Sequence, residues 1–231
     1  MKALLRCGMA ALMLAVVPAA VPEAGEVAIG GVGGMYYLPI VSIKEKRWES
    51  VVRQQYDFSC GAAAVATLLS HHYNRSTPEA EVFKAMFETG DQKLIRSRGF
   101  SMLDMKRYLE ELGYHVDGFR VDLARVQNIG VPAVAIITTN GYRHFVVVKG
   151  LDENRVLVGD PAFGTTVVER GKFEKMWDGT MLAVRDQPQE ARKQFNKAND
   201  WAVRLPAPIG NGVSRGSVAA FTRELPGMED F

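Results

Sequence analysis

The sequence contains two cysteines, and Cys60 occupies a position suited to covalent chemistry. It follows Ser59, a residue type favoured at helix N-caps, and precedes apolar residues at helical spacing that predict a helix from Ser59 to His72. Unpaired amide groups in the first turn of a helix favour negative charge, so this position stabilises a thiolate. The small residues at 61–64 allow a substrate and a facing sheet to approach the end of the helix closely. A buried structural cysteine is the alternative, because free cysteine is among the most buried residue types.

A thiolate nucleophile needs a base, and the sequence offers four histidines. His71 and His72 lie at the far end of the helix that begins at Cys60, about 16–18 Å away at 1.5 Å per residue, so we expect a solvated or capping pair there. His115 stands at the start of an expected strand, where a surface or partly packed role is expected. His144 opens an apolar strand at the rim of a sheet and is the candidate base.

Asp160 is placed to orient that histidine. The strands 144–151 and 155–160 are joined by a three-residue loop, so we expect directly paired positions to sum to 304 or 306. Residue 160 then faces residue 144 or 146, within reach of a hydrogen bond between carboxylate and imidazole. Such a bond would fix the ring tautomer and stabilise the imidazolium. Asp160 is also expected to form a turn, because Pro161 follows it, and the two roles are compatible.

A donor for the oxyanion of a tetrahedral intermediate is also required. Gln54 and Gln55 precede Cys60 by six and five residues, and a glutamine side chain with the Cys60 backbone amide would form such a hole. No cofactor is expected. No metal site is expected either, because a single thiol and the adjacent pair 71–72 give no ligand spacing typical of zinc.

The elements that would position these residues change along the chain. The first half carries helix signals, whereas the second half has short runs of Val, Ile, Phe and Tyr between turn residues. Helices followed by an antiparallel sheet predict an α+β domain. We expect helices at 59–72, 78–89 and 102–112, strands at 36–43, 114–121, 133–138, 144–151, 155–160, 165–169 and 180–185, a helical turn at 171–177 and a polar helix at 188–204.

The N-terminus is typical of a secretory signal peptide. Lys2 and Arg6 precede an uncharged stretch of 15 residues, which is too short to span a bilayer comfortably, and small residues close it at Ala19 and Ala20. We expect export to the periplasm, with a retained anchor as the alternative, and no membrane span after signal removal. Removing Lys2 and Arg6 from the 28 basic residues leaves 26, equal to the 26 acidic ones, and this balance argues against a nucleic-acid partner.

Three segments together resemble one peptidase family: QQYDFSCG at 54–61, YRHFVVV at 142–148 and VGDPAFG at 158–164. They are similar to segments of the bacteriocin-processing peptidases, cysteine peptidase family thirty-nine, which are papain-like enzymes that cut leader peptides after a double glycine. The resemblance runs from about residue 51 to residue 184. It implies a papain-like fold in which Cys60 is the nucleophile, His144 the base, Asp160 the orienting residue and Gln54 the oxyanion donor.

The mechanism that the resemblance implies is thiol acyl transfer by a cysteine endopeptidase. Cys60 attacks a peptide carbonyl, Gln54 and the Cys60 amide hold the oxyanion, and His144 protonates the leaving amine before water releases the acyl-enzyme. The implied partner is a polypeptide substrate with a Gly-Gly site. The chain then divides into a signal peptide (1–20), a Gly-rich linker and first strand (21–45), a papain-like peptidase domain (46–186) and a helical or irregular C-terminal extension (187–231).

Many members of this family form the N-terminal domain of an ABC exporter. After residue 21 this sequence has no stretch that could cross a membrane and no GxxxxGK[ST] phosphate loop. In size, signal and layout it is similar to the stand-alone exported peptidases of functional-amyloid (Fap) secretion systems, which implies a secreted or secretion-system protein, such as an amyloid component, as substrate or partner. Two alternatives stay open: a peptidase-fold binding module or chaperone with an idle triad, and acyl transfer to an amine by the same residues.

Overall fold

The computed structural model describes residues 25–31, 34–40 and 42–204, and the chain divides between residues 41 and 42 into two units. In the first unit, strands β1 (Gly25–Gly31) and β2 (Gly34–Ile40) pair as an antiparallel hairpin that ends with Gly31 opposite Gly34. Both strands lie within the segment 21–45, which was expected to hold a Gly-rich linker and a first strand. The expected signal peptide (1–20) and the segment 205–231 lie outside the described residues.

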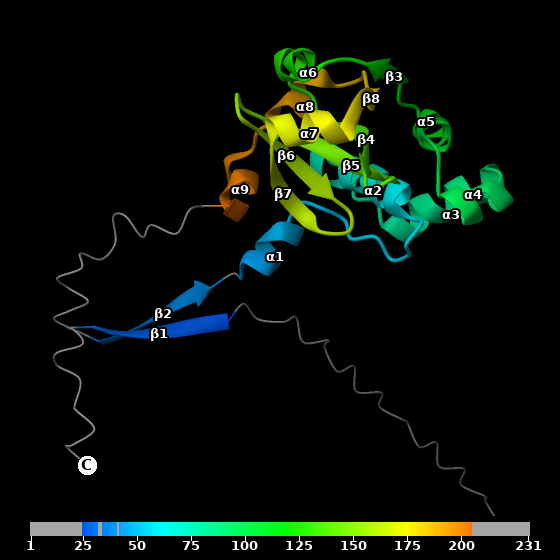
Figure 1. The fold of residues 1–231 in the computed structure, drawn as a ribbon. Helices are drawn as coiled ribbons and strands as arrows, with labels where there is room; N and C mark the ends of the chain where they lie inside the picture. Colours follow the sequence, from blue (N-terminus) through cyan, green and yellow to red (C-terminus); the bar gives the residue numbers. More distant parts are fainter. Residues whose placement is uncertain (1–24, 32–33, 41, 205–231) are drawn as a thin grey trace, which may run out of the picture. The chain divides into compact units, whose positions relative to one another are not determined.

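In the described part of the second unit, six strands form one antiparallel sheet (Figure 1). Its strand order is β3-β8-β4-β5-β6-β7, so β4 to β7 follow one another as neighbours and β8 returns to lie between β3 and β4. The strands are β3 (Val116–Arg120), β4 (Ala133–Thr139), β5 (Tyr142–Leu151), β6 (Arg155–Asp160), β7 (Gly164–Glu169) and β8 (Trp177–Val184).

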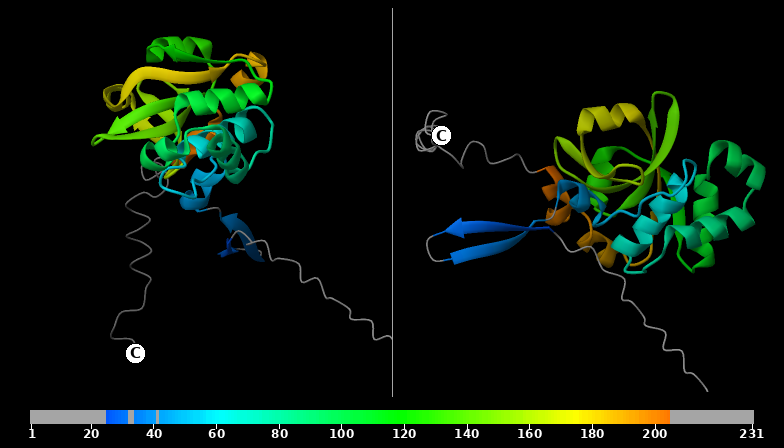
Figure 2. Two further views of the ribbon diagram at one scale, coloured as in Figure 1. Left: turned by 90° about the vertical axis from the view of Figure 1, so that its right-hand side faces the viewer. Right: turned by 90° about the horizontal axis from the view of Figure 1, so that it is seen from below.

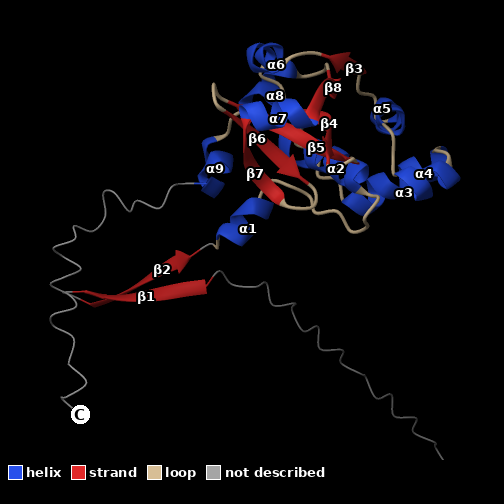
Figure 3. Cartoon of the chain, viewed as in Figure 1, coloured by secondary structure: helices blue, strands red, loops and turns tan. Residues whose placement is uncertain are grey.

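Most of the helices precede the sheet in the sequence. These are α1 (Ile43–Trp48), α2 (Cys60–His72), α3 (Glu79–Thr89), α4 (Gln92–Arg98) and α5 (Met102–Glu111). Between strands lie α6 (Leu123–Ile129) and α7 (Arg170–Met176), and after the sheet come α8 (Pro188–Lys193), α9 (Ala198–Trp201) and the 3-10 helix η1 (Ala202–Arg204). The right-hand view of Figure 2 shows α7 (yellow) and the blue-green helices α3 and α4 on opposite sides of the strands, and Figure 3 shows α3, α4 and α5 gathered together.

Two groups of buried apolar side chains cover the two faces of the sheet. Successive side chains of β5 point to opposite faces of the sheet, so Phe145 and Val147 belong to the first group and Val146 and Val148 to the second. Helices α2, α3 and α5 supply the first group, and α6 and α7 the second. At the centre of the first group, α2 has eleven of its thirteen residues buried, as befits a helix with small and apolar side chains all round. The packing therefore holds the N-terminal end of α2, with Cys60, firmly against β5.

The α+β prediction is confirmed, and each expected strand of the sheet is present, with its ends within about three residues. Helices α1, α4 and α6 were not expected, although Ser42, Asp91 and Asp122 cap them with side-chain hydrogen bonds. Because Ser42 begins a helix at Ile43, the strand expected over 36–43 ends earlier, at Ile40.

The polar helix expected over 188–204 is wrong. The chain forms α8, α9 and η1 instead, with a break at 194–197. In that break Asn196 adopts a left-handed φ of 59°, its N–H donates to the carbonyl of Lys149 (2.9 Å), and its side-chain Nδ2 donates to the carbonyl of Leu151 (3.1 Å). Hydrogen bonds to β5 therefore replace those of a continuous helix.

Candidate active site

Cys60 is the first residue of α2, and its side chain is buried, with 6% of the residue exposed. Ser59 is the N-cap residue, but its hydroxyl does not bond the helix amides. It accepts from the Tyr56 N–H (3.1 Å) and donates to the Tyr56 carbonyl (3.0 Å), so it closes the loop before the helix. Ser59 therefore caps the helix by its position, as expected, but without a side-chain hydrogen bond to the helix. Since that hydroxyl does not occupy the first-turn amides, they can stabilise negative charge at the start of α2.

Gly61 allows this end of α2 to approach α5 and β5 closely. A Cβ atom at position 61 would lie 2.6 Å from Met105 Cε, 3.1 Å from Phe100 Cβ and 3.5 Å from Phe145 Cδ2. Phe145 is the neighbour of His144 in β5, so this close packing sets the position of the thiol relative to the histidine. The close approach expected from the small residues at 61–64 is confirmed at Gly61.

His144 and Asp160 form a buried pair across neighbouring strands. His144 Nε2 lies 2.8 Å from Asp160 Oδ1, and each residue is 7% exposed. Val147 pairs with Gly159, so paired positions sum to 306 at this end of the hairpin, which is one of the two predicted registers. The carboxylate therefore reaches the imidazole diagonally across β5 and β6.

The turn between β6 and β7 fixes the Asp160 carboxylate. Its Oδ1 also accepts the backbone N–H groups of Ala162 (2.8 Å) and Phe163 (3.3 Å), so Asp160 both orients the ring and forms the turn. Gly164 pairs with Asp160 at a φ of +77°, which glycine adopts at little cost. A Cβ atom there would lie 2.7 Å from the carbonyl oxygen of Arg47, so glycine also permits the turn to rest on the end of α1.

The surroundings of His144 favour the protonated imidazole. Burial lowers the pKa of His144. The hydrogen bond with Asp160 and the neighbouring Cys60 side chain raise it by more than burial lowers it, so the pKa of His144 rises to about 9. Nε2 is taken by Asp160, while Nδ1 is buried, and the Cys60 side chain lies close enough to His144 to raise its pKa. The ring nitrogen left for the thiol is therefore Nδ1.

Gln54 is tied to both loops of the site. Its backbone N–H donates to the carbonyl of Pro161 (3.0 Å), the residue after Asp160, and its side-chain Nε2 donates to the carbonyl of Tyr56 (3.2 Å). Its Oε1 is buried and unpaired within the described part of the chain, whereas Gln55 is exposed. No hydrogen bond between Gln54 and Cys60 occurs among the described residues. The structure thus brings Gln54 to the Cys60 loop without placing its amide on the thiol.

Tyr142 is a residue of the site that the sequence did not single out. Its ring stacks on the His144 ring (centroids 6.2 Å apart, planes at 29°), and its hydroxyl donates to the carbonyl of Asp57 (3.1 Å) in the loop before Cys60. Burial and the neighbouring Cys60 and Asp57 raise the pKa of Tyr142. The only signal was its spacing, since residue 142 is two positions before His144 and shares its face of β5. Tyr142 bridges the base and the loop that carries the nucleophile.

Aromatic side chains continue this surface beside the Cys60 loop. The rings of Tyr56, Phe58 and Phe83 lie with centroids 5.4–6.0 Å apart, and Phe83 stacks on Phe87 at 5.7 Å. Tyr56 is 53% exposed, and the other three are exposed in part. This aromatic row gives an apolar surface next to the nucleophile.

The other histidines lie apart from the site. His115 is exposed and its Nδ1 lies 2.8 Å from Asp186 Oδ1, in keeping with the surface role expected. The expectation for 71–72 was a solvated or capping pair, and a solvated role is wrong for His72, because this residue is buried. Burial, reinforced by the charge of Lys149, lowers the pKa of His72 well below its usual value, so the ring is neutral. Its burial follows from the packing of α2 on all sides.

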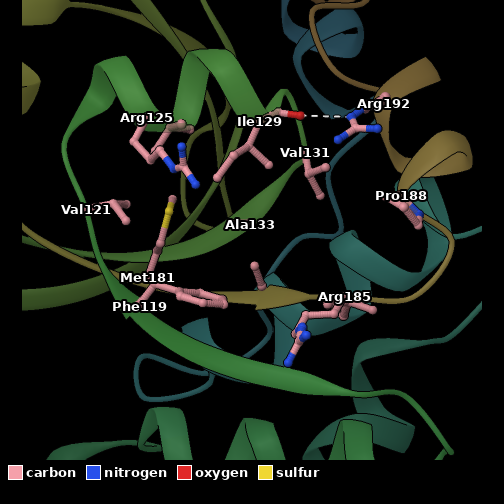
Figure 4. A pocket seen from close by; sticks show the side chains of 13 residues that line it. Phe119, Val121, Arg125, Ile129, Val131, Ala133, Met181, Arg185, Pro188 and Arg192 are labelled. Atoms are coloured by element: carbon pink, nitrogen blue, oxygen red, sulfur yellow. Dashed lines mark hydrogen bonds between the residues drawn. The ribbon is translucent and has the colours of Figure 1, made fainter.

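A separate hollow of about 400 Å³ lies between α6, α8 and strands β3, β4 and β8 (Figure 4). Its floor is apolar, with Val126, Ala133 and Met181, and Arg125, Arg185 and Arg192 stand around it. None of the four predicted site residues lines it. Arg192 Nε donates to the carbonyl of Ile129 (2.9 Å), drawn as the dashed line in Figure 4, and so ties α8 to the end of α6.

Two absences within the described residues bear on the class of site. Within them, no group of three or more His, Cys, Asp or Glu side chains could hold a metal ion. No helix that the structure describes has the length and apolar character needed to cross a membrane.

Comparison with known proteins identifies a family and close relatives. The model of the peptidase C39 family matches residues 48–189. The "Probable functional amyloid protease FapD" of Pseudomonas aeruginosa is 41% identical over 155 residues, which cover 67% of this chain and 69% of that protein. The protein of the same name from Pseudomonas fluorescens is 39% identical over 163 residues, covering 70% of this chain and 72% of its own length.

Among solved structures, the peptidase domain of Streptococcus ComA, a bifunctional ABC transporter involved in quorum sensing, matches with a TM-score of 0.51 at 21% identity. The match covers 58% of this chain and 96% of that domain, which supports the shared fold. The α+β, papain-like fold expected from the sequence is therefore confirmed.

Proposed function

The chain belongs to the peptidase C39 family and is a cysteine peptidase of the double-glycine type, and from this premise we propose that Cys60, His144, Asp160 and Gln54 carry out its reaction. The observation that carries the proposal is the buried His144–Asp160 pair, 2.8 Å apart, beside the Cys60 thiol at the N-terminus of α2. Asp160 holds Nε2, which directs Nδ1 to the thiol and then to the leaving amine.

In the proposed mechanism the Cys60 sulfur, as thiolate, attacks the carbonyl carbon of the scissile bond, and the carbonyl oxygen becomes an oxyanion. The Cys60 backbone amide and a Gln54 side chain turned toward the substrate stabilise that charge. His144 Nδ1 donates its proton to the departing nitrogen as the C–N bond breaks, leaving a thioester on Cys60. His144 then takes a proton from water, which attacks the thioester and releases the acid and the thiolate.

The substrate we propose is a secreted or secretion-system polypeptide with a double glycine before the cut, of the functional-amyloid kind. Two relatives at about 40% identity carry the name functional amyloid protease. Cys60 is only 6% exposed and has Tyr142 as a neighbour, and residues without side chains reach a nucleophile so placed most easily. The aromatic row of Tyr56, Phe58, Phe83 and Phe87 suits apolar side chains of the substrate.

The experiment that tests the site is alkylation of Cys60 with iodoacetamide at pH 7, run alongside cleavage of a Gly-Gly peptide. We expect fast labelling and cleavage in the wild type, and loss of both in His144→Ala. The matched control is His115→Ala, an exposed histidine with its own aspartate, which should change neither. Slow labelling that is unchanged in His144→Ala would overturn the proposal and favour the binding-module alternative.

Two further measurements test the finer parts of the proposal. Replacing the Gly-Gly pair of the peptide by Val-Val should abolish cleavage without affecting labelling, and equal cleavage of both peptides would refute the double-glycine preference. Adding hydroxylamine separates hydrolysis from acyl transfer, because a hydroxamate as the main product at low amine concentration would favour the transferase alternative.

The compartment we propose is the periplasm, supported by the signal-like sequence at 1–20. Fractionation of a Gram-negative host expressing the full chain should place the shortened protein in the periplasmic fraction. Recovery of the full-length chain in the cytoplasm would contradict this location.

A further inference from the structure

A buried lysine, Lys149, lies near the C-terminal end of β5, the strand that also carries His144. Its side chain is fully buried, although lysine is almost never so unless it is paired. The register between β5 and β6 shifts between Val148 and Gly150, so Lys149 is the extra residue of a β-bulge. A bulge leaves one residue unpaired in the ladder and re-aims its side chain. The fold thus directs an ammonium group into the protein interior.

The charge of Lys149 is balanced from the C-terminal extension. Its Nζ lies 2.9 Å from Oδ2 of Asp200, a residue of α9 that is itself 6% exposed. The bulge also leaves the Lys149 carbonyl free to accept the Asn196 N–H (2.9 Å), and Asn196 packs so closely that a Cβ atom on Gly150 would clash with its Oδ1. The extension therefore binds both the backbone and the ammonium of Lys149.

The same ammonium holds the segment that leads to Gln54. Nζ donates to the hydroxyl and to the carbonyl (3.2 Å) of Ser50, and the Ser50 hydroxyl in turn donates to Asp200 Oδ1. Four residues later, Gln54 bonds the carbonyl of Pro161. Ser50 is thus an anchor shared by the ion pair and the Gln54 segment.

Contacts with Gly159 brace the Gln54 segment against the β5–β6 hairpin. A Cβ atom on Gly159 would lie 2.9 Å from Lys149 Cδ and 3.2 Å from Val51 Cγ2, so the lysine stem and the Gln54 segment both rest on this residue of β6. A continuous set of contacts therefore joins α9 to the Gln54 segment. The family match ends at residue 189, so Asp200 lies outside it, whereas Lys149, Ser50 and Gly159 lie inside.

We propose that Asp200 is a positioning residue of the active site, which holds the Gln54 segment in place through Lys149 and Ser50. The extension that follows the peptidase domain is then a structural part of the catalytic unit. The inference rests on the proposed function, because it assigns the oxyanion role to Gln54. Removing one member of a buried ion pair leaves an uncompensated charge, so loss of Asp200 should displace Lys149 and, with it, Ser50.

The test is Asp200→Asn in the full chain, with kcat and KM for a Gly-Gly peptide and the iodoacetamide rate measured well below the melting temperature. Alkylation needs Cys60 and His144 but no oxyanion hole, so the two assays separate the parts of the site. We expect kcat to fall at least about tenfold, since one oxyanion donor contributes about 10²–10³ in rate, with KM and the alkylation rate within about twofold of wild type. Glu190→Gln, which breaks the exposed Glu190–Lys193 pair of the same extension, is the matched control and should change nothing.

A second variant keeps the inference testable if Asp200→Asn does not fold. Ser50→Ala removes only the hydroxyl between the two charges and should also lower kcat while leaving alkylation unchanged. An unchanged kcat in either folded variant, or a parallel fall of alkylation and kcat, would overturn the positioning role. Failure of the proposed function would look different, because the wild type itself would then show no His144-dependent labelling or cleavage.

Discussion

The substitution Asp160→Asn tests the electrostatics of the proposed base most directly. It keeps the shape of the side chain but removes the charge 2.8 Å from the imidazole of His144. Burial alone would lower the pKa of His144 below its ordinary 6.5, yet the pKa stands at about 9 because Asp160 and Cys60 raise it. The difference between 6.5 and about 9 corresponds to roughly 3 kcal/mol in favour of the protonated ring. Asp160 contributes most to raising the pKa of His144, so removing its charge should remove the larger part of this free energy.

The assay is kcat/KM for a Gly-Gly peptide between pH 5 and pH 10. In the wild type the rate should fall as the pH rises through about 9, because the imidazolium that protonates the leaving amine is lost. In Asp160→Asn this fall should begin at least about one pH unit lower, and the rate at pH 7 should drop about a hundredfold or more. Asp186→Asn is the matched control, since it removes the partner of the exposed His115 at the same 2.8 Å.

The same pair should contribute to stability with a definite pH dependence. A histidine whose pKa rises on folding binds its proton more tightly in the folded state, so its contribution is complete below 6.5 and is lost as the pH rises through about 9. The difference in melting temperature between wild type and Asp160→Asn should therefore be large at pH 6 and small at pH 10. Two outcomes would refute the assignment of the raised pKa to Asp160. One is a fall of kcat/KM at the same pH in wild type and Asp160→Asn, and the other is an equal loss of stability in the variant at pH 6 and pH 10.

Three further substitutions test other contacts of the site and its helix. Gly61→Ala should lower stability by about 1–3 kcal/mol and slow alkylation, because its Cβ would lie 2.6 Å from Met105 Cε; a melting temperature equal to wild type would contradict this. Tyr142→Phe removes the 3.1 Å hydrogen bond to the Asp57 carbonyl, a bond of about 1 kcal/mol that holds the Tyr142 ring beside the site. Alkylation of Cys60 should then become about two- to fivefold faster. Slower labelling would show that Tyr142 does not restrict access to the thiol. His72→Leu should raise the melting temperature most at acidic pH. Below about pH 6.5 a histidine in the unfolded chain binds a proton, whereas the buried His72 ring of the folded chain does not, so His72 then favours unfolding. The same difference in melting temperature between wild type and variant at every pH would argue against a neutral His72.

The sequence predicted the parts of the site that short-range rules determine. Cys60 opens α2 because an apolar run at helical spacing begins there. A loop of three residues restricts β5 and β6 to few registers, and one of these brings Asp160 to His144. The choice of His144 among four histidines followed from the same pattern, because it alone opened an apolar strand beside a suitable carboxylate.

The errors arose where distant contacts overrule local preference. Ser59 has the residue type of a side-chain cap, but its hydroxyl bonds Tyr56 instead, which closes the loop. A polar helix over 188–204 satisfied the local pattern, but hydrogen bonds from Asn196 to β5 break it. Tyr142 looked like an ordinary strand residue because its partner Asp57 is 85 positions away in the sequence.

Lys149 shows most clearly why the supporting contacts could not be read from the sequence. A lysine within an apolar strand suggests an exposed edge, yet here it is fully buried, because a bulge turns it inward and an aspartate from α9 meets it. Among the described residues its polar partners are Ser50, Thr165 and Asp200, which come from three different regions of the chain. Such a group forms only when these three regions have come together. If Asp200 positions the Gln54 segment as we propose, the thiol and imidazole would owe their geometry to α2 and the β5–β6 hairpin, whereas the oxyanion donor would depend on the extension. Alkylation and peptide cleavage would then respond separately to mutations in the extension and together to mutations at Gly61 or Asp160.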